Sequence, residues 1–131
     1  MQAGPSKFDL EDRLLDYTAA VIRFVETMNR TQAGRHVAGQ LLRSGTASLP
    51  NHGEAQAAES TADFVHKMSL CLKELRESRR WLRLVQRVPL VRFPSSVDPL
   101  LTETDELVRI FFASIRTARI RPSSRGGSNG R

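Results

Sequence analysis

Several features that would identify a secreted or membrane protein are missing from this sequence of 131 residues. It has a single cysteine, Cys71, which cannot form a disulfide within the chain, so we expect a reducing, cytoplasmic environment. The N-terminus, MQAGPSKFDLEDRL, lacks the basic-then-apolar order of a secretion signal, and no apolar run reaches the length of a membrane span. We therefore expect a soluble cytosolic protein with no membrane partner.

Motifs for catalysis and for metal or cofactor binding are also missing. No strand pattern occurs, and so no glycine-rich phosphate loop follows a strand. Carboxylate-bridged di-metal bundles need Glu-x-x-His motifs on two helices, whereas the nearest pattern here is a single Asp63-x-x-His66. We predict that the protein is not an enzyme and has no catalytic residues, no metal site and no cofactor. Cys71 is expected to be inert core packing.

The sequence does contain the apolar periodicity of long helices. From Thr61 to Val88, apolar or small residues recur at alternating four- and three-residue steps, which places them on one stripe of a helix. Similar stripes run through a segment from Asp9 to about Asn29 and through a segment that starts at Asp98 and Pro99. The three stripes are Phe64, Met68, Cys71, Leu75, Ser78, Leu82 and Val85; Leu10, Leu14, Tyr17, Val21, Phe24 and Met28; and Leu100, Thr104, Leu107, Phe111, Ser114 and Ala118.

A further helix is expected from about Arg35 to Ala58, and it is rich in small residues that let a neighbouring helix approach closely. Pro50 should kink this helix or remove one backbone hydrogen bond. Asn51 and Glu54 lie one turn apart on a small, apolar face, and we expect them to share a hydrogen-bond network, because burying either alone would be costly. Together with Gln40 they are predicted to form a structural polar layer.

Short connections between these helices predict antiparallel neighbours, so the fold class should be all-α, an antiparallel up-and-down four-helix bundle over residues 9–120. Residues 1–8 are expected to be flexible, and residues 121–131 to form a disordered basic tail, because this end of the chain is polar and rich in glycine.

Apolar residues beside the Thr61–Val88 stripe predict an oligomer interface, since they widen the apolar surface beyond what one neighbouring helix usually covers. For Trp81, which lies among arginines, stacking on a nucleic-acid base is the alternative. The predicted interface residues are Leu70, Trp81, Leu84 and Val88.

Basic residues dominate the charge, with a net charge of +6 and a pI of about 10.7, which favours polyanionic partners. Lys73, Arg76, Arg80, Arg83 and Arg87 step along a second face of the same predicted helix, and we call these five residues the basic ridge. A row of cations can bind successive phosphates and release counterions. The alternative is a solvated helix face, partly neutralised by Glu74 and Glu77. The predicted nucleic-acid contacts are the basic ridge together with Arg79, Arg116, Arg119 and Arg121.

The runs QLLRSGTASLPNHGEAQ and AESTADFVHKMSLCLKELRESRRWL resemble the signature of a small bacterial four-helix bundle family. Its members were first noticed as proteins encoded in intervening sequences of 23S ribosomal RNA genes. The family is related to the accessory variability determinant protein of diversity-generating retroelements. The resemblance covers residues 10–118, although His52 stands where the family commonly has an apolar or aromatic residue. Matching positions include Gln40, Leu41, Arg43, Ser44, Thr46, Asn51, Glu54, Asp63, Phe64, Lys67, Leu72, Lys73, Glu74, Glu77 and Leu82.

The resemblance implies a four-helix bundle, assembly into a five-fold ring and a nucleic-acid-binding role without known catalysis. Together with the basic ridge, it predicts a homopentameric accessory protein that binds structured RNA or DNA, with a reverse transcriptase as a candidate partner. The alternative is a protein-binding scaffold that docks an acidic partner and does not contact nucleic acid.

Overall fold

The computed structural model describes residues 7–121, and all four long elements in this range are helices. The predicted all-α class is therefore confirmed, and none of these helices is long and apolar enough to cross a bilayer. The predicted flexible N-terminus and basic tail lie almost entirely outside the described residues. The elements are α1 (Lys7–Val25), α2 (Gln32–Gln56), α3 (Thr61–Arg87), the short 3-10 helix η1 (Pro94–Val97) and α4 (Asp98–Ile120).

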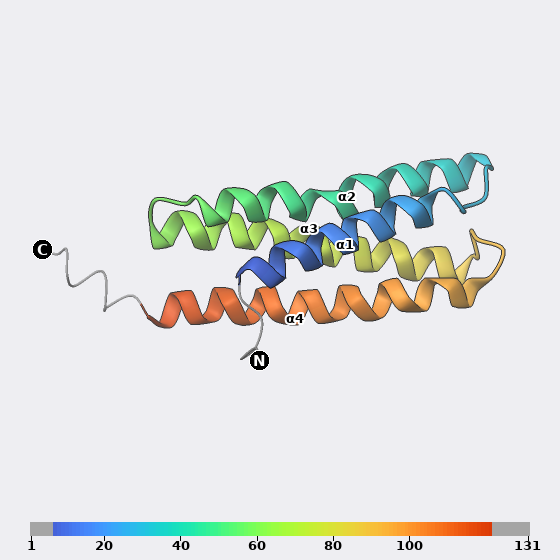
Figure 1. Cartoon of the computed structure of the whole chain (residues 1–131). Helices are drawn as coiled ribbons and strands as arrows, with labels where there is room; N and C mark the ends of the chain where they lie inside the picture. Colours follow the sequence, from blue (N-terminus) through green and yellow to red (C-terminus); the bar gives the residue numbers. More distant parts are fainter. Residues whose placement is uncertain (1–6, 122–131) are drawn as a thin grey trace, which may run out of the picture.

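Successive helices run in opposite directions along one long axis, as Figure 1 shows. Helix α1 is the shortest of the four and begins part-way along the bundle. Consequently, α1 does not reach the end of the bundle that contains the α2–α3 turn and the end of α4.

The boundary between the first two helices differs from the sequence expectation. Helix α1 ends at Val25 and not near Asn29, because both the amide and the hydroxyl of Thr27 bond to Phe24 O, at 2.9 and 2.7 Å, and tighten the chain into a turn. Helix α2 begins at Gln32, three residues before the expected start, because the hydroxyl of Thr31 accepts a hydrogen bond from the Gly34 amide.

Gly34 is required in this connection. A Cβ atom built there would lie 2.0 Å from Asn29 O, so any side chain would collide with the backbone of the turn. The glycine therefore permits the tight entry into α2 that brings α1 and α2 together.

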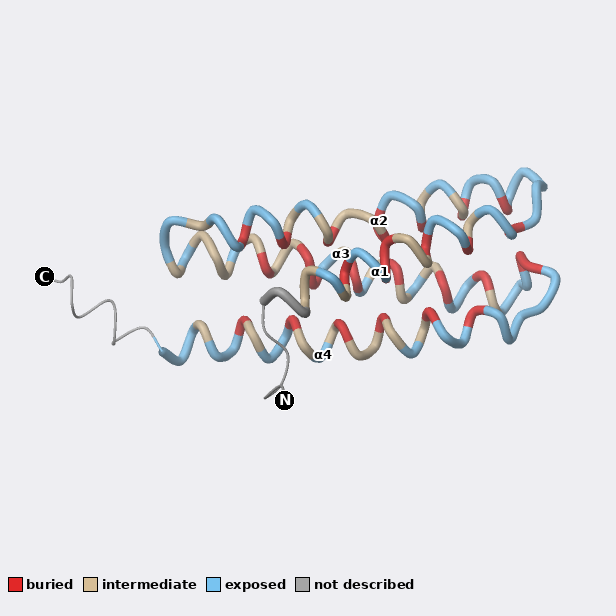
Figure 2. Tube along the Cα trace, viewed as in Figure 1, coloured by how far each residue is buried: buried red, intermediate tan, exposed pale blue. Residues whose placement is uncertain are grey.

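The predicted stripes form most of the core (Figure 2). The exception is the last part of α4, where Ile115 is buried while Ser114 and Ala118 are only half-buried. Helix α1 does not extend to this part of the bundle, and the buried face of α4 therefore turns toward α3. The stripe predicted from a regular four-helix bundle is wrong here by about one residue.

Several polar side chains in the core are paired across helices. The hydroxyls of Ser44 in α2 and Ser78 in α3 lie 2.8 Å apart, and the phenol of Tyr17 in α1 lies 2.6 Å from the hydroxyl of Thr104 in α4. His52 of α2 is fully buried, with Nδ1 2.9 Å from a carboxylate oxygen of Glu11. Each pair satisfies groups that would be costly to bury alone.

Candidate nucleic-acid interface

The outer face of α3 carries all five residues of the basic ridge in exposed positions. Among residues 10–121, none of the five takes part in an ion pair. Their placement follows from the sequence spacing, since residues at three- and four-residue steps share a helix face.

Arg79 was predicted to belong with them, but the structure places it elsewhere. It is half-buried, and its Nε lies 2.5 Å from a carboxylate oxygen of Asp105 in α4. Arg79 directly precedes Arg80, and adjacent residues of a helix face different sides. Arg79 therefore points toward the neighbouring helix rather than outward. Arg79 therefore links α3 to α4, and we leave it out of the candidate interface.

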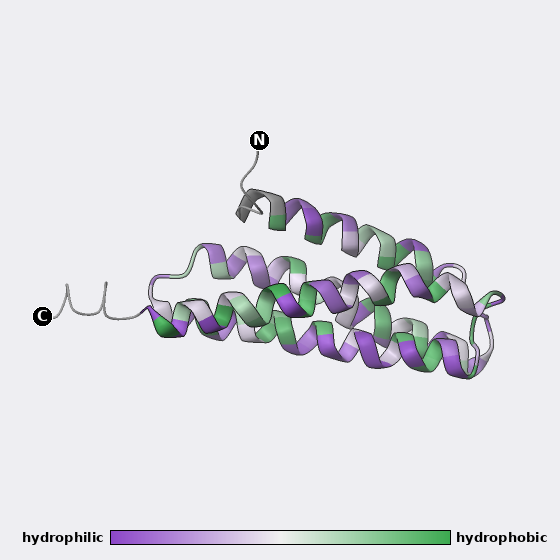
Figure 3. Cartoon of the chain, turned by 90° about the horizontal axis from the view of Figure 1, so that it is seen from below, coloured by the Kyte–Doolittle hydropathy of each residue, from purple (hydrophilic) through white to green (hydrophobic). Residues whose placement is uncertain are grey.

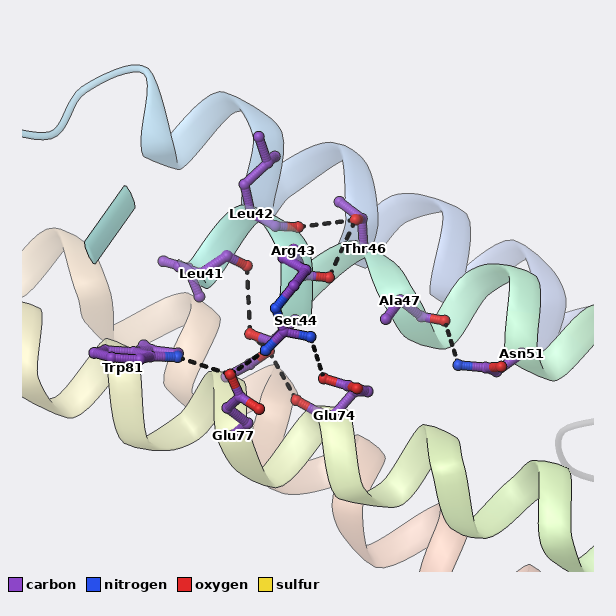
Figure 4. A network of polar contacts seen from close by, with 11 residues as sticks. Leu41, Leu42, Arg43, Ser44, Thr46, Ala47, Asn51, Glu74, Glu77 and Trp81 are labelled. Carbon is purple, nitrogen blue, oxygen red and sulfur yellow. Dashed lines mark hydrogen bonds and ion pairs between the residues drawn. The ribbon is translucent and has the colours of Figure 1, made fainter. Parts of the chain in front are cut away.

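The carboxylates that could have neutralised the ridge are turned toward α2. Arg43 of α2 reaches across to Glu74 and Glu77 of α3 and bonds to both, as Figure 4 shows. Glu77 also accepts a hydrogen bond from the indole N–H of Trp81 at 3.1 Å. The pKa of Glu77 is lowered, chiefly by the hydrogen bond from Trp81 and also by the one from Arg43. Partial burial of the carboxyl group acts in the opposite direction and raises its pKa. Glu74 and Glu77 are therefore engaged on the side of α3 that faces α2.

A groove between α3 and α4 gathers arginines from both helices, and we call it the arginine groove. Arg76 comes from α3, while Arg116 and Arg119 come from the last turns of α4. All three are exposed, and none has an ion-pair partner within the described part of the chain. The groove has a volume of about 400 Å³, and no lining residue is acidic. The complete lining is Ser69, Leu72, Arg76, Phe112, Ile115, Arg116, Arg119 and Ile120.

Apolar side chains accompany the arginines in this groove. Leu72 and Ile115 are buried, whereas Phe112 and Ile120 are 50% and 67% exposed. Figure 3, which views the molecule from the α4 side, shows hydrophobic residues among hydrophilic ones along the helices. The groove therefore combines positive charge with an exposed aromatic ring.

Arg121, predicted to act with Arg116 and Arg119, lies elsewhere. It lines a larger depression of about 880 Å³ on the part of the bundle that α1 leaves uncovered, together with residues that include Leu10, Phe64 and Met68. Two residues along a helix are about 200° apart, so Arg121 and Arg119 face different sides of α4.

The predicted polar layer does not form as expected. Asn51 donates to Ala47 O of its own helix at 3.0 Å, in the turn before Pro50, where the helix lacks one amide donor. Glu54 is exposed and pairs with Lys67 of α3 at 2.7 Å, and Gln40 is half-buried. The expected network between Asn51 and Glu54 is wrong, because Glu54 faces α3 at the surface rather than the core.

The predicted interface residues differ in exposure. Leu84 and Val88 are 40% and 55% exposed, whereas Leu70 is half-buried. Trp81 is also half-buried, and its ring packs edge-to-face on His36 of α2 with centroids 6.4 Å apart. The indole of Trp81 is therefore packed within the subunit and is not presented for stacking.

Sequence reasoning missed two members of the site. Phe112 was not singled out from the sequence, yet it lies one turn before Arg116 on the same face, a spacing that could have revealed it. The role of Arg43 in turning Glu74 and Glu77 away from the ridge had no signal in the sequence, because it depends on how two helices are aligned. Within residues 7–121, no group of three or more His, Cys, Asp or Glu side chains is placed to hold a metal ion.

Comparison with known proteins shows a similarity to a solved structure. No protein-family model matches the sequence, and no curated protein matches it. Among solved structures, a protein of unknown function from the S23 ribosomal protein family of Bacteroides thetaiotaomicron superposes with a TM-score of 0.75 at 26% sequence identity. The match covers 84% of this chain and 97% of that protein. The chain is therefore similar in fold, and more distantly in sequence, to an S23 ribosomal protein family member, in agreement with its resemblance to proteins encoded within 23S ribosomal RNA genes.

Proposed function

We propose that this protein is a non-catalytic accessory protein that binds RNA or DNA through the arginine groove and the adjoining basic ridge. The observation that carries the proposal is the meeting of Arg76, Arg116 and Arg119 in one groove without an acidic lining residue. Three unpaired cations at close range repel one another, and a phosphate backbone relieves that repulsion while releasing counterions.

Homo-oligomerisation and the cellular setting are part of this proposal. Exposed Leu84 and Val88 next to the basic ridge would bring several ridges together in a ring, pentameric by resemblance, and repetition would raise avidity for a long nucleic acid. We also propose a cytoplasmic location, which suits the buried free thiol of Cys71, and a reverse transcriptase as a candidate partner.

The test is fluorescence anisotropy of a labelled structured RNA at salt concentrations from about 50 to 200 mM. The variant carries Arg76→Ala, Arg116→Ala and Arg119→Ala. The matched control carries Arg23→Ala, Arg30→Ala and Arg35→Ala, which remove the same charge from exposed positions around the α1–α2 connection. We expect the groove variant to bind more weakly, with a slope of log K against log salt shallower by about 2 to 3, and the control to keep most of the wild-type affinity and slope.

An absence of RNA or DNA binding at the lowest salt would contradict the proposal. Equal losses in the groove variant and the control would show that net charge, and not the groove, attracts the nucleic acid.

A protein-binding scaffold is the second candidate, because exposed Phe112 and Ile120 beside the arginines would also suit an acidic, amphipathic helix. Competition separates the two candidates. Unlabelled RNA of unrelated sequence should displace a nucleic-acid ligand completely, whereas a scaffold would retain its acidic protein partner.

A further inference from the structure

We infer that the arginine groove is selective for single-stranded nucleic acid and that Phe112 is the residue on which an unpaired base stacks. This inference rests on the proposed function and specifies the form of nucleic acid that the site takes.

Phe112 is the aromatic ring of the groove. Half of its surface is exposed, and it lines the groove together with the buried side chains of Leu72 and Ile115. Exposure of a phenyl ring to water is unfavourable in free energy, and a base stacked on the ring would remove that apolar surface from water.

Arginines from both helices line the same groove as Phe112. Arg116 is one helical turn, about 6 Å, further along α4, and Arg76 reaches the same groove from α3. A base on Phe112 would thus place its own or the next phosphate beside a guanidinium. Aromatic rings interleaved with arginines are the usual means by which proteins bind single strands without sequence preference.

A base within a duplex cannot stack on Phe112. Its bases are paired and stacked on each other, so only its phosphates are available to the arginines, and an unstacked base must be released before it can meet Phe112. The groove volume of about 400 Å³ lies in the range of small-ligand sites and suits one nucleotide rather than the width of a double helix.

Phe93 provides a matched aromatic control. It is 63% exposed, but it belongs to the connection before η1, and Arg92 of its own segment already lies over its ring at 5.2 Å from the centroid. Phe93→Ala removes a phenyl ring that is at least as exposed as that of Phe112, and Phe93 does not line the arginine groove.

The experiment measures anisotropy with labelled single strands of about 12 nucleotides, as RNA and as DNA, and with duplexes of the same length. Wild-type protein is compared with Phe112→Ala, Phe112→Leu, Phe112→Trp and Phe93→Ala, and circular dichroism checks that each variant is folded. Phe112→Leu keeps apolar volume but not the aromatic face, whereas Phe112→Trp keeps the face.

We expect Phe112→Ala and Phe112→Leu to weaken single-strand binding by about 5- to 100-fold while leaving duplex binding and the salt slope unchanged. Phe112→Trp should bind as tightly as the wild type or more tightly, and Phe93→Ala should have no effect. Equal affinity for single strands and duplexes, or single-strand binding that is insensitive to Phe112, would overturn the inference while the proposed function stands. If neither form binds, the proposed function fails as well.

Discussion

Tyr17 places its phenol at the centre of the bundle, where it is 2% exposed and meets Thr104. Burial raises the pKa of this phenol to about 12, although hydrogen bonds with Thr104 and Ser78 lower it in part. Nearby, the serine pair between α2 and α3 and the contact of His52 with Glu11 connect other helices. In this core, contacts made by hydroxyl groups and one imidazole connect the helices, as ion pairs do on the surface.

The titration of Tyr17 can be followed directly, because it is the only tyrosine in the sequence. We expect the ultraviolet absorbance of its phenolate to develop near pH 12 in the folded protein and near pH 10 in concentrated urea. Since the folded state holds the proton more tightly, stability contributed by Tyr17 is complete below pH 10 and is lost as the pH rises from 10 to 12. The loss should total about 3 kcal/mol.

Tyr17→Phe is the control for this prediction, because Thr104 retains its bond to Leu100 O. Its unfolding free energy should fall less steeply over the same pH range. Identical titration midpoints in buffer and in urea would contradict the burial of the phenol.

Helix α2 packs closely against α1 at one of its glycines. A Cβ atom at Gly45 would lie 2.7 Å from Cγ1 of Val21 in α1, and both residues are buried. Gly39 and Gly53 lie in the same helix but are exposed, and a Cβ atom at either position would meet no other side chain or neighbouring helix within 4 Å. Of these three glycines, the packing with α1 requires Gly45 but neither Gly39 nor Gly53.

Alanine substitutions should separate these two kinds of glycine. Gly45→Ala should lower the unfolding free energy by about 1 to 3 kcal/mol, because the stiff Val21 side chain has no room to move. Gly39→Ala and Gly53→Ala should each raise it by up to about 1 kcal/mol through helix propensity. Urea unfolding of the three variants gives the comparison, and a Gly45→Ala variant as stable as the wild type would refute the close contact.

At the scale of the elements, the sequence predicted features that depend on a single helix, such as where that helix begins and ends. Helix α3 ends within one residue of its expected limit, and the start of α4 at Asp98 was also correct. The end of α1 was missed because Thr27 forms a turn that periodicity does not reveal. The pairing of Ser44 with Ser78 and the turning of Arg43 toward α3 were missed because they depend on the relative alignment of two helices.

At the scale of the whole molecule, the packing of the single chain leaves apolar side chains exposed beside the basic ridge. Leu84 and Val88 are exposed on α3, next to the basic ridge, while Trp81 is held within the subunit. Apolar side chains at such positions are typical of an interface between subunits.

Self-association can be measured by size-exclusion chromatography with light scattering. We expect wild-type protein to form a closed oligomer, a pentamer by resemblance, and Leu84→Glu with Val88→Glu to dissociate it, because burying two unpaired carboxylates is costly. Ala33→Glu with Thr102→Glu adds the same charge at exposed positions on α2 and α4 and should leave the oligomer intact. A wild-type protein that is monomeric at every concentration would reject the ring.

The short first helix also determines where the chain could be reconnected. Leu10 in the first turn of α1 and Arg121 after the end of α4 line the same depression. A linker between them, with new termini opened in the exposed turn at Ala57, would preserve every helix in its place. The fold is thus topologically suited to circular permutation, and the arginine groove could be displayed from a chain that begins with α3.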